Sequence, residues 1–239
     1  MLAIKQTEPT EYGLLLYIEE LAKLLAAQRR RILGSPGNVV HDPFFWMQEA
    51  ERMRITMTPH TLNVAQYGAA EVMAQMGVRT GADHITSEIQ GWLSGYLFDD
   101  IQGINNVTRQ ALREPLETYF TTTMSKRELI DWIDRIGSFG AARAERIATT
   151  ETTTAYYEGG RIFQEELTAT TGLQSIAVWR TNRDGRVCPI CAPRHNTARY
   201  PGPTQAATGR GFEHGWETPP PAHVNCRCWV DYFVASSDD

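Results

Sequence analysis

The stretch Asp184-Gly-Arg-Val-Cys-Pro-Ile-Cys191 and its counterpart His223-Val-Asn-Cys-Arg-Cys228 decide the fold of the C-terminal part of this chain. They contain all four cysteines of the protein, as one CxxC pair and one CxC pair, and a histidine precedes the second pair. Thiolates and imidazoles from two such pairs are typical ligands of tetrahedral zinc. We therefore predict a structural Zn²⁺ site that uses four of five candidate ligands. The candidates are Cys188, Cys191, His223, Cys226 and Cys228.

Cysteines in this arrangement also permit other interpretations. A disulfide could form within the CxxC pair or between the two pairs. A thioredoxin-like redox site would use the CxxC pair alone, but no βαβ pattern precedes it and the CxC pair would have no role. A zinc deaminase needs a histidine and a glutamate ahead of its cysteine pair, and this order is absent.

A zinc-dependent nuclease or DNA-processing protein is the main alternative function for the same region. Its candidate residues lie in and just after the loop between the two cysteine pairs: His195, His214, His223 and Asn225. Histidines in such a cluster could activate water or hold a second metal ion. Because a structural metal site already explains the region, we expect no enzymatic activity.

Strand-like patterns flank the two cysteine pairs. The period of the side chains changes to about two over residues 176–181, which predicts a strand leading into the first pair. Residues 226–234 predict a second strand, on which Cys226 and Cys228 share one face. Residues 193–221, rich in Gly, Pro, Thr and His, predict a long irregular loop. A metal site would close this loop, whose apolar content is too low for it to fold alone.

Upstream of these strands the apolar pattern is helical. Asp42-Pro43 and Thr58-Pro59 each have the form of an N-cap followed by a proline in the first helical turn. A capping box, Ser125 with Glu128, opens a later helix. The apolar spacing predicts helices over residues 14–31, 43–54, 59–77, 85–98, 105–119, 125–136 and 141–167.

These patterns together predict a mainly α, α+β fold. A helical N-terminal half is followed by a long helix and a small β module that a zinc site staples together. We divide the chain into a helical region, residues 1–124, and a second region, residues 125–239, that carries the Cys/His cluster.

Two groups of residues in the helical half have alternative interpretations. The aromatic residues Phe44, Phe45, Trp46 and Trp92 could fill the core or dock on another protein. The triplet Arg29–Arg31 lies where a helix C-terminus favours cations, and it could also contact phosphate.

Charge and hydropathy restrict the partners. A formal net charge of -5 argues against a protein that binds DNA over its whole surface, but a local basic patch remains compatible with it. The candidate DNA contacts flank the first cysteine pair: Arg180, Arg183, Arg186, Arg194 and Arg199. The N-terminus has no signal-peptide pattern, and no apolar run approaches the roughly 20 residues of a membrane span. We expect a protein made in a cytoplasm, with no membrane partner.

Several motifs occur together and in a fixed order. They are Ala144-Glu-Arg-Ile-Ala-Thr-Thr-Glu151, Ala155-Tyr-Tyr-Glu-Gly159, Trp179-Arg-Thr181, Asp184-Gly-Arg-Val-Cys-Pro-Ile-Cys-Ala192 and Pro220-Pro-Ala-His-Val-Asn-Cys-Arg-Cys228. In this combination the chain resembles the phage Mu F-like minor head proteins, the phage head morphogenesis family, from about residue 125 to residue 234. It departs from the family at Thr149, where an arginine is usual.

The resemblance implies a minor capsid protein of a tailed bacteriophage. Such a protein is a low-copy component of the virion, inside the head or at the portal vertex, after synthesis in the host cytoplasm. The implied partners are the portal protein, other head proteins and phage DNA. The implied role is viral assembly, with involvement in DNA packaging or in DNA that is ejected.

Overall fold

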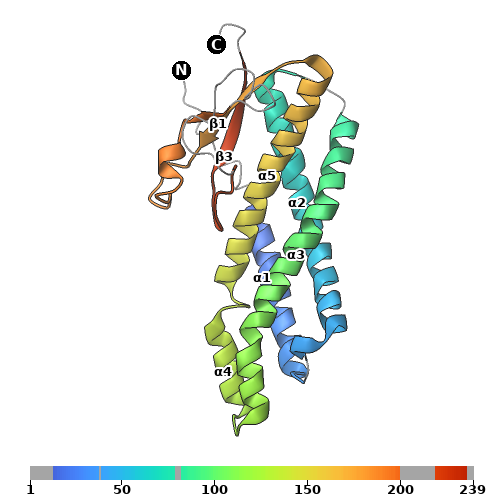
Figure 1. Ribbon diagram of the computed structural model, residues 1–239, viewed down its shortest axis with the longest axis vertical. Coiled ribbons are helices and arrows are strands. Elements are labelled where there is room, and N and C mark those ends of the chain that lie inside the picture. The colour runs from blue at the N-terminus through green and yellow to red at the C-terminus, as the bar shows by residue number, and fades with distance from the viewer. Residues whose placement is uncertain (1–12, 38, 79–81, 200–218, 236–239) are drawn as a thin grey trace. The chain divides into compact units, whose positions relative to one another are not determined.

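The computed structural model describes residues 13–37, 39–78, 82–199 and 219–235 (Figure 1). The helices are α1 (Leu14–Gly34), α2 (Pro43–Met76), α3 (Ala82–Thr121), α4 (Lys126–Ile136) and α5 (Ala141–Thr171). The strands are β1 (Ser175–Arg180), β2 (Ala198–Arg199) and β3 (Trp229–Val234), and short 3-10 helices cover Val39–His41 (η2) and Ala192–Arg194 (η3). The predicted mainly helical α+β fold is confirmed. In the described residues, no helix is both long enough and apolar enough to cross a membrane.

Helix α2 is continuous where the sequence predicts two helices. Pro59 lies inside it and removes one backbone donor, yet the helix does not end. The predicted boundary at Thr58-Pro59 is therefore wrong. Met57 and Thr61, on either side of the proline, are almost fully buried, so tertiary packing holds the helix through the defect.

Helix α3 likewise joins two predicted helices. It runs from Ala82 to Thr121 through residues 99–104 and contains Pro115. Ile101, in the predicted gap, is 3% exposed and continues the buried face. Val107, farther along the same helix, is 58% exposed.

The described chain forms two compact units, each assembled from segments that are distant in sequence. We call them the sheet unit, mainly Thr61–Gly91 with Thr149–Asp239, and the helical unit, Leu15–His60 with Trp92–Ala148. Helices α2, α3 and α5 each contribute residues to both units. The predicted division at residue 125 stays a prediction.

Apolar side chains from several helices form the core of the helical unit. Its buried members are Ile32, Leu33, Val39, Val40, Trp46, Leu112, Leu116, Leu129, Ile133 and Phe139. Helix α4 is fixed at both ends, because Ser125 and Glu128 form the predicted capping box and Gly137 ends the helix in the left-handed conformation. The core therefore depends on the apolar spacing of helices whose ends are set by local sequence.

Two arginines of the triplet, Arg29 and Arg31, form ion pairs, and Arg31 also lies in the last turn of α1, where a helix C-terminus favours cations. The Arg31 guanidinium donates two hydrogen bonds to Glu49, at 2.6 and 2.7 Å, and the Glu49 side chain is 1% exposed. Arg29 donates to both carboxylate oxygens of Asp134 at 2.6 and 2.8 Å. These arginines connect α1 to α2 and to α4 within the helical unit.

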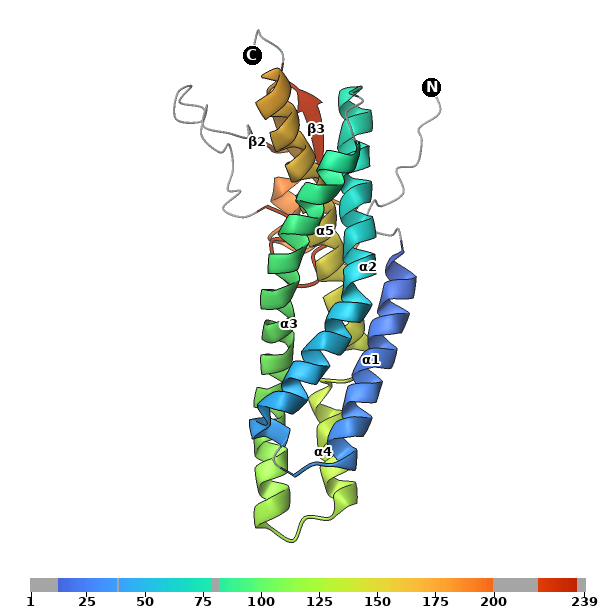
Figure 2. The same cartoon turned by 90° about the vertical axis from the view of Figure 1, so that its right-hand side faces the viewer.

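In the sheet unit, α2 and α5 approach each other until their backbones touch. A Cβ added at Gly68 would lie 2.1 Å from the Tyr156 carbonyl oxygen, and one at Gly159 would lie 1.8 Å from the Ala65 carbonyl oxygen. Only glycine fits at these two crossing points. This contact fixes α5 as the support on which the sheet lies (Figure 2).

The sheet has the strand order β2-β1-β3, and both pairings are antiparallel. Strand β2 was not predicted, because its two residues lie inside the predicted loop. Strand β3 begins at Trp229, after the second cysteine pair, so strand parity does not orient the cysteines. The Gln75 side chain of α2 accepts a hydrogen bond from the Tyr232 backbone N–H at 2.9 Å and so ties the edge strand to the helix.

Candidate metal centre

The candidate ligands lie on two arms of the sheet unit. The first arm, with Cys188 and Cys191, follows β1 and leads into η3, and the second arm, residues 223–228, leads into β3. Antiparallel pairing of β1 with β3 places Arg180 opposite Trp229, at the end of the sheet where both arms begin. The ends of the two paired strands therefore deliver the two arms to the same place.

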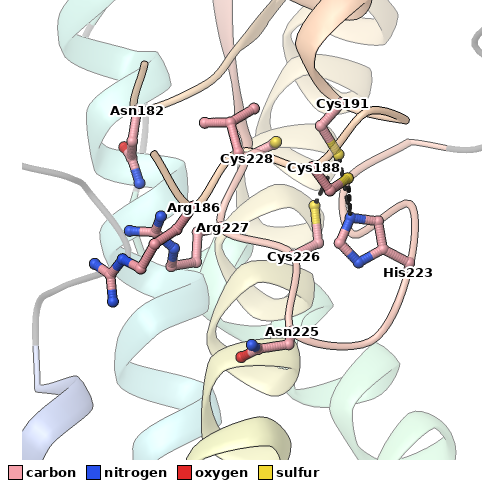
Figure 3. A pocket seen from close by; sticks show the side chains of 10 residues that line it. Asn182, Arg186, Cys188, Cys191, His223, Asn225, Cys226, Arg227 and Cys228 are labelled. Carbon is pink, nitrogen blue, oxygen red and sulfur yellow. Dashed lines mark hydrogen bonds between the residues drawn. The ribbon is translucent and has the colours of Figure 1, made fainter. Parts of the chain in front are cut away.

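The ligand atoms meet as two overlapping groups. Cys188, Cys191 and His223 form one group, and Cys191, Cys226 and Cys228 form the other, with all ligand atoms of a group within 4.8 Å of one another. Figure 3 shows the first group and Cys226 turned toward one another across a pocket. Such groups are close enough to hold a metal ion. Cys191, which belongs to both, is the most central ligand.

The distances fit a tetrahedral site. The Sγ atoms of Cys191 and Cys226 are 3.8 Å apart, and the four cysteines are free thiols. Two Zn–S bonds of about 2.3 Å at a tetrahedral angle separate their sulfur atoms by about 3.8 Å. The donor set of sulfur and imidazole nitrogen also suits zinc, whereas magnesium and calcium prefer oxygen ligands.

His223 is oriented as a ligand by its own backbone. Its Nδ1 lies 2.8 Å from the Val224 carbonyl oxygen, which assigns the ring proton to Nδ1 as the donor of this bond. The other nitrogen, Nε2, then directs its lone pair toward Cys188 Sγ at 3.0 Å and Cys191 Sγ at 3.3 Å. A backbone carbonyl that fixes the ring in this way is a common support of metal-binding histidines.

Contacts among the crowded thiols shift their pKa values in opposite directions. A hydrogen bond with Cys226, then one with Cys228 and then burial raise the pKa of Cys191. The same contact with Cys191, and then one with Cys228, lowers the pKa of Cys226. Like charges this close cannot all form without a compensating cation. A bound divalent cation would supply that charge and release the protons.

Threonine hydroxyl groups of α5 form hydrogen bonds with the backbone of the second arm. Thr153 Oγ1 donates to the Cys226 carbonyl oxygen at 2.7 Å, and Thr150 Oγ1 accepts from the Asn225 backbone N–H at 2.8 Å. Asn225 has φ of 66°, a left-handed turn that asparagine tolerates. The threonine-rich stretch of α5, Thr149-Thr-Glu-Thr-Thr-Thr154, therefore supports the second arm, because hydroxyl groups of Thr150 and Thr153 bond its backbone.

An ion pair joins the two arms beside the ligands. Arg227, which lies between Cys226 and Cys228 in sequence, donates to both carboxylate oxygens of Asp184 at 2.8 Å. The Arg227 guanidinium then lowers the pKa of Asp184 by its hydrogen bonds. Sequence reasoning missed this contact, although both residues stand in the two quoted motifs.

Trp179 of β1 anchors the segment that follows the first arm. It is fully buried, its backbone N–H donates to the Thr197 carbonyl oxygen, and its carbonyl accepts from the Asn196 N–H. At the second arm, a hydrogen bond with Cys191 lowers the pKa of Cys228, but the contact with Cys226 and burial outweigh it and raise that pKa.

The chain matches the family model described as Phage Mu protein F like protein over residues 103–231, which is more than half of its length. It belongs to the phage Mu protein F like family. Searches of curated proteins and of solved structures returned no significant match. The resemblance that the motifs predict is therefore confirmed, and it begins before residue 125. Family membership supports a phage head morphogenesis protein in the virion, with other head proteins as partners.

In this member of the Mu F-like family, His195 lies outside both ligand groups. Its Nδ1 accepts a hydrogen bond from the Thr181 backbone N–H at 3.1 Å and lies 3.1 Å from Thr181 Oγ1, while Nε2 accepts from Arg183 Nε at 2.8 Å, so both ring nitrogens face donors. Burial, and then the charges of Arg183 and Arg180, lower the pKa of His195. Its lone pair is therefore occupied, and His214 lies outside the described residues.

Of the predicted DNA-contacting arginines, Arg186 lines the same pocket as the candidate ligands, and Arg180 and Arg186 are engaged by carboxylates. Arg180 Nε donates to Asp231 at 2.6 Å, and Arg186 Nε lies 3.4 Å from Asp184. Arg194 stacks its guanidinium 5.1 Å from the centre of the Trp179 ring.

Two of these arginines form no ion pair with a carboxylate within the described residues: Arg183 and Arg194. Arg183 has φ of 56° and is exposed at the turn before the first arm. The side chain of Arg199 lies outside the description.

Proposed function

We propose that this Mu F-like protein is a minor structural component of a tailed-phage head, present in few copies near the portal vertex. In this role it assists head assembly and contacts DNA that is packaged or ejected. The observation that carries the proposal is the family match over residues 103–231, which encloses all the candidate ligands. The rigid arms supported by α5 provide a fixed surface for such contacts.

Particle composition tests the proposal. Quantitative mass spectrometry of purified virions of the encoding phage should detect the chain at a small fraction of the major capsid protein. Chemical cross-linking should join it to the portal protein. Detection in infected cells but not in particles would overturn the structural role, and cross-links to capsid subunits alone would overturn the portal location.

We propose that the cluster binds one structural zinc ion. Four of the five candidate ligands would hold it, with Cys191 among them because it belongs to both groups. A bound zinc supplies charge for the crowded thiolates and a cross-link between the arms. Its role would be to fold the second arm onto the sheet, since threonine and arginine contacts alone are few.

DNA contact is proposed for the arginines beside the centre, with the largest share from Arg183 and Arg194. Each phosphate contact makes binding weaker at higher salt. The full chain should bind duplex DNA with an affinity that falls as salt rises, and the double substitution Arg183→Gln, Arg194→Gln should reduce the salt slope. Arg30→Gln, an exposed arginine of the helical unit, is the matched control. An unchanged slope in the double variant would overturn this proposal.

We propose that the protein is not an enzyme. The zinc nuclease alternative needs a histidine free to activate water, whereas both ring nitrogens of His195 face hydrogen-bond donors and His223 faces the thiols. Purified protein should leave supercoiled plasmid intact with Mg²⁺, Mn²⁺ or Zn²⁺. Nicking that disappears on His195→Ala would establish the nuclease instead.

A further inference from the structure

The first part of α2, residues 43–60, is apolar on two opposite faces. One face is buried in the helical unit and includes Trp46, Met53 and Met57. The exposed residues of this segment are Pro43, Phe44, Met47, Gln48, Glu51, Arg54, Ile55 and Pro59. Phe44, Met47 and Ile55 are 60%, 60% and 62% exposed. Large apolar side chains gathered on one helix face mark an interaction surface.

The aromatic cluster predicted to dock or to fill the core does both. Trp46 is buried and its indole N–H donates to the Val39 carbonyl oxygen, and Phe45 is half-buried against it. Phe44 points the other way and stays exposed. A helix turn thus directs neighbouring aromatics to opposite faces, and the outward face has no partner among the described residues.

The exposed face reads almost the same in both directions. Residues four apart form a row that winds by about 40° per step around a helix. The row centred on this face is Met47, Glu51 and Ile55, with Pro43 and Pro59 at its flanks. Proline stands at both ends, an apolar side chain of similar size lies on each side, and the charge lies at the centre. A two-fold interface requires this kind of self-complementary surface, whereas an unrelated partner does not.

The charges on the face are also self-complementary. Arg54 donates to both carboxylate oxygens of Glu51 at 2.7 and 2.8 Å, so the centre of the row carries one ion pair. Two copies related by a two-fold axis at Glu51 would bring two such pairs together, with two positive and two negative charges. Arg54 of each copy would then lie within reach of the other copy's carboxylate, and the junction would carry no net charge.

We propose that this face of α2 is the contact between two copies of the chain, with the two helices antiparallel and crossing at Glu51. Met47 of each copy then meets Ile55 of the other. The row is about 24 Å long at 1.5 Å per residue. One helix face buries less than the roughly 800 Å² per partner of a standard interface, so the dimer is weak and forms in the micromolar range.

Sedimentation velocity of the full chain over a concentration series tests this proposal. Wild-type protein should show a reversible monomer-dimer equilibrium. Ile55→Glu should raise the dissociation constant of the dimer at least tenfold, because it would bury another negative charge near Glu51 at the contact. Val107→Glu is the control, since Val107 is equally exposed on α3 but lies outside this face. Circular dichroism should show both variants folded.

A cysteine at the two-fold axis gives an independent readout. Glu51→Cys should form an intermolecular disulfide under mild oxidation, and Gln102→Cys, on exposed α3 surface, should not. A wild-type chain that stays monomeric throughout and fails to cross-link would overturn the proposal. So would a dimer that Ile55→Glu leaves unchanged. A chain that stays monomeric by itself, but binds a different head protein through this face, would also overturn the proposal. In that case Ile55→Glu would weaken only the binding of the chain to that other protein.

Discussion

The helical unit and the two arms of the sheet unit that carry the candidate ligands are held in different ways. In the helical unit, buried aliphatic and aromatic side chains from several helices form a continuous core. In the arms, the cysteines Cys191, Cys226 and Cys228 are buried, and the α5 residue Thr153 that bonds the second arm is almost fully covered. The first region is stabilised by apolar area, and the second depends on a few directional contacts.

This difference predicts different responses to damage. Loss of one apolar side chain weakens a core by a limited amount, because the remaining contacts persist. Loss of a metal ion removes every bond that converges on it at once. The arms should therefore unfold locally while the helices remain, which separate measurements on the two regions can detect.

Metal removal should produce the largest effect. Structural zinc contributes on the order of 10 kcal/mol of binding free energy, much of which appears as folding of the site. Chelation should therefore abolish amide protection in residues 186–194 and 222–228 while α1, α3 and α4 keep theirs, as measured by hydrogen exchange. Equal loss of protection in the helical unit would show that the two regions do not respond separately.

A core substitution in the helical unit provides the reverse test. Leu129 is fully buried, so Leu129→Ala should lower the free energy of unfolding by roughly 2 to 5 kcal/mol in denaturant titrations. Metal content, measured by elemental analysis, should stay at the wild-type value. If Leu129→Ala also lowered the metal content, the helical unit and the arms would not be stabilised independently.

The backbone contact between α2 and α5 predicts an intermediate effect. Gly159→Ala would place a methyl group 1.8 Å from the Ala65 carbonyl oxygen, so the helices must move apart at a cost of about 1 to 3 kcal/mol. Gly95→Ala is the matched control, because nothing lies within 4 Å of its added Cβ and alanine favours the helix by about 0.5 to 1 kcal/mol. Thermal unfolding of the two variants should show shifts of opposite sign.

The threonine support of the second arm should give the smallest effect. Thr153→Val leaves the Cys226 carbonyl oxygen without its donor and should cost about 1 to 2 kcal/mol. Metal release to a competing chelator should become faster. Thr154→Val, which removes only a local bond to the Thr150 carbonyl within the helix, should leave the release rate unchanged. Equal rates in both variants would show that α5 does not support the arm.

The sequence predicts most helices and the ligand cluster because each leaves a local pattern. Capping by Ser125 depends on residues three apart, and the cysteine pairs carry their spacing within a few residues. The continuity of α2 through Pro59 leaves no such pattern. It depends on burial of Met57 and Thr61 by residues far away in sequence, which overrides the local preference for a break.

Contacts between distant segments were the main features that the sequence could not reveal. The pairing of Asp184 with Arg227 needs the two arms to be adjacent, and Thr153 meets Cys226 only after α5 lies under the sheet. Among the predicted DNA-contacting arginines, Arg180 pairs with Asp231, and this pairing follows from the register of β1 with β3, which the sequence does not show. Composition shows that charges exist, and only the fold shows which of them are paired.

The metal content of the freshly purified full chain tests the central claim most directly. Native mass spectrometry with elemental analysis should find about one zinc per chain, and all four cysteines should alkylate after denaturation without reductant. The double substitution Cys188→Ser, Cys191→Ser should remove the metal. A metal-free chain whose cysteines alkylate only after reduction would contradict the account and establish disulfides in place of the zinc site.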